Sequence, residues 1–257
     1  MSELTLRPTR AGEAVVMAAR CLRLSRRNVD ALLTSLLLPV LLMLLFVYLF
    51  GGAIDTGTRY VTYVVPGVLL LCASFGAAST AVSVTTDLTN GVIERFRTMD
   101  VSATAILGGH VVASIARNTV STVLVLALAV AIGFRPAVDP LRWLAAFGVL
   151  LIFLLAVSWL SAAFGLLVRT PEAAGGFTFL AMFLPYPSSA FVPVETMPGW
   201  IRGFADHQPV TPVIETLRAL LLGTPTGTAP TLAVAWCLGF LALSVPLTAV
   251  LFRRRVA

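Results

Sequence analysis

The 257-residue sequence contains no lysine, so all 18 of its basic residues are arginine. A phosphate-binding loop needs a lysine beside the phosphates of ATP, so this absence argues against ATP hydrolysis by the common phosphate-loop route. The three cysteines do not cluster, because Cys72 and Cys237 lie in apolar runs and Cys21 lies in an amphipathic stretch. This spacing indicates neither a disulfide framework nor a cysteine metal site.

Carboxylates are missing from the long apolar runs, although ion-coupled carriers keep ionisable residues inside their membrane spans. The alternative class, a carrier or channel that does not use ATP, therefore loses its main support. The two histidines, His110 and His207, have no partner at metal-ligand spacing, and no cluster of His, Cys and carboxylate residues suggests an enzyme. We therefore expect no catalytic residue, metal or cofactor in this chain, and energy for any uphill transport must come from another chain.

Apolar residues make up 58% of the sequence and charged residues only 12%, whereas a soluble domain is about 45–50% apolar and about 25% charged. Several runs exceed the ~18 residues that mark a membrane helix. The first run follows a long basic segment, so it is expected to be a retained span and not a removed signal peptide. The sequence predicts one all-α, multi-pass membrane domain over residues 1–257. Its six predicted spans cover about 31–50, 60–86, 109–132, 143–168, 173–192 and 231–252.

Arginine placement predicts the orientation of these spans, because cytoplasmic loops carry an excess of basic residues. With both termini inside, twelve arginines fall on the inner side and five on the outer side, with Arg117 near the inner end of the third span. The basic excess is then explained by anionic lipid at the membrane surface, with no need for nucleic acid. The predicted location is a cell membrane with both termini in the cytoplasm.

Residues 9–28 predict an amphipathic helix that lies in the membrane interface. Thr9 is a plausible N-cap, and Arg20, Arg23 and Arg27 share one face, opposite an apolar face of Val15, Ala18, Ala19 and Leu22. The alternative is a simple basic extension of the first span.

The predicted inner loop at residues 87–102 begins with a turn signal at Asn90-Gly91. The residues from Val92 onward suit a short helix, and Asp100 or Ser102 could cap the span that follows. A charged helix with one aromatic residue has the form of a protein-docking element. The alternative is a solvated loop helix without a partner.

Two motifs carry a family resemblance: Glu94-Arg-Phe-Arg-Thr-Met99 in the inner loop, and Phe191-Val-Pro193, Met197-Pro-Gly-Trp200, Pro209-Val-Thr-Pro212 and Leu217-Arg-Ala-Leu-Leu221 past the fifth span. In these motifs and in its six spans the chain resembles the permeases of ABC-type-2 exporters, especially the daunorubicin-resistance group. One departure is Asp100, where the family often has proline.

The resemblance implies a membrane subunit without its own ATPase, in which the loop after span two is a coupling helix that docks on a separate ATPase subunit. Two ATPase copies, which bind ATP and Mg, would pair with two permease copies or a permease and its paralogue. By position, the coupling residues would be Val92, Glu94, Arg95, Phe96, Arg97 and Met99. The resemblance also implies that the membrane is that of a bacterial cell. The expected substrate is amphipathic: a drug, an antibiotic or a lipid.

The outer segment at 193–230 predicts two short amphipathic helices, at about 198–205 and 212–222, that are too short to span a bilayer. They would cap the exit of a pathway; the alternative is a passive lid. The gate residues are Pro198, Trp200, Ile201, Phe204, Pro212, Leu217 and Arg218. Candidate pathway residues inside the spans are Pro39, Phe46, Phe75, Arg117, Phe177, Phe183 and Tyr186. Arg117 would either extend to the cytoplasmic interface or contact an anionic substrate or a neighbouring loop.

Overall fold

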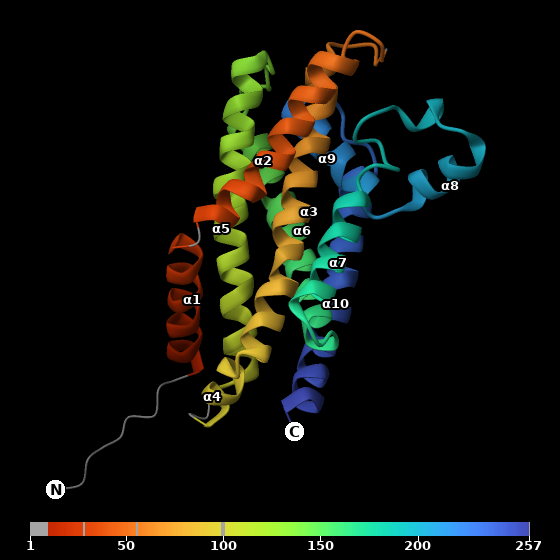
Figure 1. Cartoon of the computed structure of the whole chain (residues 1–257). Helices are drawn as coiled ribbons and strands as arrows, with labels where there is room; N and C mark the ends of the chain where they lie inside the picture. Colours follow the sequence, from red (N-terminus) through yellow and green to blue (C-terminus); the bar gives the residue numbers. More distant parts are fainter. Residues whose placement is uncertain (1–9, 28, 55, 99–100, 257) are drawn as a thin grey trace, which may run out of the picture.

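The computed structural model describes residues 10–27, 29–54, 56–98 and 101–256, and these residues form helices and connecting turns without a strand (Figure 1). The predicted all-α class is therefore confirmed. Among the described residues, four helices are long and apolar enough to cross a membrane: α3 (Tyr60–Thr89), α5 (Ala103–Ile132), α6 (Pro140–Leu167) and α10 (Ala229–Val256). At ~1.5 Å per residue, each is longer than the ~30 Å hydrocarbon core.

Helix α3 occupies the centre of the bundle. Its residues Val64, Val68, Leu70 and Leu71 have no exposed surface, and it packs against α5, α6 and α7 (Pro171–Phe183). The other long helices each keep an apolar face exposed, for example at Val123 of α5. Such faces suit a lipid environment, where apolar surface needs no protein cover.

The first predicted span corresponds to α2 (Val29–Leu45), which continues without a break into the π-helical turn η1 (Phe46–Phe50). Helix α5 begins at Ala103, six residues before the predicted start of the third span at residue 109. The Ser102 side chain makes no capping bond; its backbone N–H donates to Glu13 Oε2 at 3.1 Å instead. Asp100, the other predicted cap, lies outside the described residues.

The fifth predicted span is not one helix. Helix α7 starts as expected after the Thr170 cap, with Pro171 in its first turn, but it ends at Phe183, and residues 184–191 form turns. Its 13 residues reach only about 20 Å. Pro185 and Pro187 explain the early end, since proline lacks the N–H that a helix needs. The largely apolar composition of residues 173–192 had favoured the prediction of one continuous span.

The predicted short helices are present with small shifts. Residues 9–28 contain α1 (Arg10–Arg27), the loop at 87–102 contains α4 (Val92–Thr98), and residues 193–230 contain the 3-10 turn η2 (Val194–Thr196), α8 (Gly199–His207) and α9 (Val210–Leu222). Thr9, the predicted cap of the first helix, lies outside the described residues. Gly91, at the predicted turn before α4, has a φ of +67°, which glycine adopts at little cost.

Two glycines let neighbouring helices approach closely. A Cβ on Gly165 of α6 would lie 2.6 Å from the carbonyl oxygen of Ala81 in α3, and the Thr85 hydroxyl donates to the Gly165 carbonyl at 2.8 Å across the same crossing. A Cβ on Gly109 of α5 would lie 2.9 Å from the backbone of Met17. Because glycine has no side chain at these points, α3 can sit against α6 and α1 can sit against α5.

Both ends of the described chain lie at one end of the bundle, together with α1 and α4 (Figure 1). Arg255 near the C-terminus donates to the carbonyl of Val168 at 3.0 Å, so the α6–α7 turn lies there too. We call this the terminal end. The segments that the arginine count assigned to one side of the membrane are therefore neighbours in space.

Candidate functional site

Helix α4 is anchored on its inner face and exposed on its outer face. Ile93 is fully buried and Phe96 and Val92 are partly buried, whereas Glu94 and Arg95 are exposed. Arg97 belongs to the helix, but its side chain and all of Met99 lie outside the described residues. The sequence motif indicated Phe96 and missed Ile93, the most buried residue of the helix.

The anchor of α4 is a hydrophobic cluster at the terminal end, which we call the terminal cluster. It joins α4 to α1, α3, α5, α6 and α10 and consists of Met17, Val84, Ile93, Ala105, Ile106, Leu107, Ala162, Leu166 and Phe252, with Phe96 packed against it. A displacement of α4 would therefore change the packing of five other helices, because close-packed side chains transmit strain.

Arg20 of α1 connects α4 to α3. Its guanidinium carbon lies 5.0 Å from the centre of the Phe96 ring, and its Nη1 donates to Asp87 Oδ2 at 3.0 Å. The same Asp87 oxygen lies 3.2 Å from His110 Nε2 of α5. Arg20 and Arg23, predicted to share one face, therefore differ in environment, since Arg23 is exposed and donates only to its own helix, at Ala19.

Asp87 and His110 border a polar cleft of about 640 Å³ between α1, α3, α5 and α7. Arg117 of α5 points into this cleft, where Nη2 donates to Ser79 Oγ at 3.0 Å and Nη1 donates to Ser25 Oγ at 3.3 Å. Arg117 lies 14 residues after the start of α5, about 21 Å along the helix axis. Cys21 also lines the cleft, and burial raises the pKa of its thiol.

A continuous series of aromatic rings, which we call the aromatic series, leads from the cleft to the end of the bundle opposite the termini. It begins at Phe179, which lines the cleft. The successive ring centres are 4.7, 5.5, 5.1, 4.3 and 5.5 Å apart, and the rings in order are Phe179, Phe183, Tyr186, Phe191, Phe46 and Phe50. These distances are within the usual range of aromatic contact.

The structure thus brings five of the seven predicted pathway residues into two connected features. Phe75 and Arg117 line the cleft, and Phe46, Phe183 and Tyr186 belong to the aromatic series. The other two lie elsewhere: Phe177 stacks on Phe164 at 4.6 Å, and Pro39 is buried within α2. The residues that sequence reasoning missed are Ser25, Ser79, Asp87, His110, Thr178, Phe179 and Phe191.

The predicted gate residues divide between two helices. On α8, Trp200 is 84% exposed and Phe204 is 53% exposed, and the helix stands away from the bundle (Figure 1); Pro198 before it is exposed and Ile201 is partly buried. Helix α9 is packed into the bundle, with Pro212 and Leu217 buried.

Arg218 fixes α9 against α3 and the turns after α7. Its guanidinium carbon lies 3.9 Å from the centre of the Tyr63 ring, and the side chain donates to the carbonyls of Tyr63 and Ser189. A cation that stacks on an aromatic face and also donates to carbonyls holds its partners in a defined geometry.

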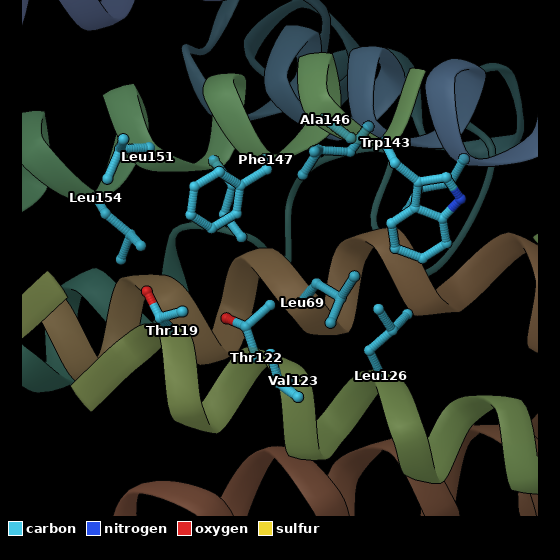
Figure 2. A pocket seen from close by; sticks show the side chains of 13 residues that line it. Leu69, Thr119, Thr122, Val123, Leu126, Trp143, Ala146, Phe147, Leu151 and Leu154 are labelled. Carbon is cyan, nitrogen blue, oxygen red and sulfur yellow. The ribbon is translucent and has the colours of Figure 1, made fainter. Parts of the chain in front are cut away.

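A second cavity, of about 210 Å³, is apolar and lies between α3, α5, α6 and α9. Figure 2 shows Leu69 of α3 and Leu126 of α5 facing Phe147 and Trp143 of α6 across it. Its lining carries no charged side chain. Among the described residues, no three His, Cys, Asp or Glu side chains lie close enough to hold a metal ion.

Comparison with known proteins gives consistent matches. Residues 13–222 match the protein family described as ABC-2 type transporter. The chain is 32% identical to the daunorubicin resistance ABC transporter permease protein DrrB1 of Streptomyces coeruleorubidus, over 88% of this chain and 81% of that protein. It is 23% identical to the probable doxorubicin resistance ABC transporter permease protein DrrC of Mycobacterium tuberculosis, over 98% of this chain and 96% of that protein.

Proposed function

Because the chain belongs to the ABC-2 type transporter family, we propose that it is the permease subunit of an ATP-driven exporter that moves an amphipathic molecule out of the cytoplasm or inner leaflet. The family and the four apolar helices indicate a membrane protein. We further propose six membrane crossings, with α2 and the segment from α7 through residue 192 as the two beyond the four long helices. The terminal end then faces the cytoplasm, in agreement with the arginine distribution.

The energy would come from two copies of a separate ATPase subunit that bind ATP and Mg and dock on α4. The exposed Glu94 and Arg95 are available for such a contact, whereas Ile93 and Phe96 attach the helix to the terminal cluster. This division refines the sequence interpretation, since Phe96 contacts Arg20 within the chain. Phe96 would then act mainly inside the permease, while Glu94 and Arg95 orient the partner.

One observation carries the proposal: Arg20 contacts Phe96 on α4 and Asp87 at the cleft, so the docking helix and the cleft share a side chain. Movement of α4 when the ATPases close would change the cleft directly. Substrate would enter the cleft, pass along the aromatic series and leave near α8. Alternating access would open the pathway between this permease and a second copy or a paralogue first inward and then outward. Two of the relatives are named for resistance to daunorubicin or doxorubicin, which supports an amphipathic molecule as cargo.

The test is reconstitution of the permease with its partner ATPase, followed by ATP hydrolysis and export assays over a panel of amphipathic compounds. A double variant, Glu94→Arg with Arg95→Glu, should lose co-purification of the ATPase and compound-stimulated hydrolysis while membrane insertion stays normal. Arg169→Glu is the matched control, because Arg169 is an exposed charge at the same end but outside α4. Normal ATPase binding and export by the double variant would refute the docking role of α4.

A further inference from the structure

The polar cleft holds a positive charge that no carboxylate balances among the described residues. Arg117 donates to two neutral hydroxyls, those of Ser25 and Ser79. Asp87, the carboxylate of the cleft lining, is already paired with Arg20 and contacts His110. Arginine stays protonated in proteins, so the charges of Arg20 and Asp87 cancel and that of Arg117 remains. A charge inside a membrane protein is costly and faces a partner or a water-filled cavity.

Two hydroxyls of the same cleft also lack partners. Thr80 Oγ1 of α3 and Thr178 Oγ1 of α7 are buried, and within the described part of the chain neither has a hydrogen-bond partner. Buried polar atoms are nearly always paired in native proteins. Unpaired hydroxyls on two helices that border one cavity indicate that the cavity receives a molecule with hydrogen-bond acceptors.

The size and remaining lining of the cleft exclude a small ion as the whole ligand. Its volume of about 640 Å³ falls in the ~300–1,000 Å³ range of sites for drug-sized molecules. Leu24, Phe75 and Phe179 add apolar surface beside Arg117, and Leu24 and Phe179 are 50% and 61% exposed. The cleft therefore combines a cationic part with an apolar part that is open to the surroundings.

We propose that this cleft binds an anionic amphiphile, a molecule whose phosphate or carboxylate headgroup pairs with Arg117 and whose apolar body lies against Phe75 and Phe179. The unpaired hydroxyls of Thr80 and Thr178 donate hydrogen bonds to the oxygens of the headgroup. The assignment deepens the proposed export function by naming a chemical class of cargo, but the binding step itself does not require ATP. A cationic amphiphile is disfavoured, because its headgroup would meet the like charge of Arg117.

The test measures binding to the purified permease alone, by native mass spectrometry from a neutral detergent. The probes are dioctanoyl phosphatidic acid, dioctanoyl phosphatidylcholine, an alkyltrimethylammonium of similar chain length and inorganic phosphate. We expect phosphatidic acid to bind about tenfold tighter than phosphatidylcholine and the cation, because its headgroup is net negative beside the guanidinium, whereas the other two bring a quaternary ammonium group. Arg117→Gln should abolish this preference, whereas Arg169→Gln, which removes an exposed charge at the same end, should keep it.

Thr80→Val and Thr178→Val keep the test decisive if Arg117→Gln fails to fold. Each replaces an unpaired buried hydroxyl with a methyl of the same shape, so thermal stability should be kept or raised. Each should nevertheless weaken phosphatidic acid binding several-fold. Unchanged binding in both threonine variants would overturn the proposal, as would equal binding of phosphatidylcholine. Equally tight binding of inorganic phosphate would also overturn it, by showing a free-anion site.

Failure of this proposal can be told apart from failure of the export function. If the unmodified permease prefers phosphatidic acid but shows no ATP-driven export, only the export function is refuted. Export that continues normally in a reconstituted Arg117→Gln permease, with no anion preference in either protein, would refute only the binding site.

Discussion

Replacement of Arg20 by alanine removes the side chain that the docking helix and the cleft share. The ion pair with Asp87 is partly shielded from water, since the two side chains are 25% and 15% exposed. A hydrogen bond to a charged group of this kind contributes about 1.5–3 kcal/mol. The contact with Phe96, at 5.0 Å, adds about 0.5–1 kcal/mol. His110 still contacts Asp87 in the variant, so we expect a net destabilisation of about 2–3 kcal/mol.

Arg23→Ala is the matched control. Arg23 lies one turn further along α1, is exposed and bonds only to the carbonyl of Ala19 in its own helix. Its removal should change stability by less than about 0.5 kcal/mol. A double-mutant cycle of Arg20→Ala with Phe96→Ala isolates their contact, for which we expect a coupling energy of about 0.5–1 kcal/mol.

The assay compares unfolding in mixed micelles with ATP hydrolysis and export in proteoliposomes. Arg20→Ala should retain the ATPase, because Glu94 and Arg95 are untouched, yet export fewer molecules per ATP hydrolysed than Arg23→Ala. Arg20→Lys should restore part of the stability but less of the coupling, because an ammonium group lacks the planar face that stacks on a ring. If Arg20→Ala and Arg23→Ala export equally per ATP, Arg20 does not connect α4 to the cleft.

Three further expectations concern topology, the outer helices and the central crossing. In a background without the native cysteines, Thr56→Cys should react with an impermeant thiol reagent in intact cells and Val256→Cys should not; labelling of the latter would reverse the proposed orientation. Leu217→Ala should destabilise the protein by about 2–5 kcal/mol, because Leu217 is 2% exposed, whereas Trp200→Ala should change stability by less than about 0.5 kcal/mol and lower export only if α8 gates the exit. Gly165→Val should force α6 from α3, with a loss of about 1–3 kcal/mol in unfolding experiments; an unchanged unfolding midpoint would contradict the close crossing.

The difference in burial between Leu217 and Trp200 changes how the outer segment should be tested. The motif past the fifth span grouped both residues as gate elements, but α9 is part of the core and α8 is not. A charge at Leu217 would damage the fold and could not report on gating. Trp200, on the exposed helix, allows a test of gating without loss of the core.

The helices were predictable where apolar runs are long and uninterrupted, as in α3 and α6, because only a helix satisfies the backbone inside a bilayer. Prediction failed where hydropathy and helix formation diverge. The stretch 184–191 carries no charge but contains Pro185 and Pro187, so it leaves the helix. Residues 103–108 lie outside the predicted third span, yet they form the first turns of α5, a helix that packs on α1.

The cleft was less predictable than the helices, since its polar groups come from segments far apart in the sequence. Arg117 bonds to serines that lie 38 and 92 residues away, and no local pattern encodes such pairs. The sequence contains one local sign of the cleft. The residues Phe75, Ser79, Ser83 and Thr86 follow each other at helical spacing, and all of them line the cleft. A hydroxyl stripe on a membrane helix indicates a face that meets protein or cargo and not lipid.

Helix α1 shows why the amphipathic pattern alone was an incomplete guide. Its sequence fits an interfacial anchor, and Val15, 68% exposed, is available for that role. A different face, with Met17 and Cys21 buried, packs against the bundle, and Arg20 and Ser25 supply polar contacts to the cleft. Helix α1 would therefore couple attachment to the membrane surface, the position of α4 and the binding of the headgroup by Arg117. Loss of α1 should therefore impair cargo binding as well as insertion, whereas loss of a passive anchor would impair insertion alone.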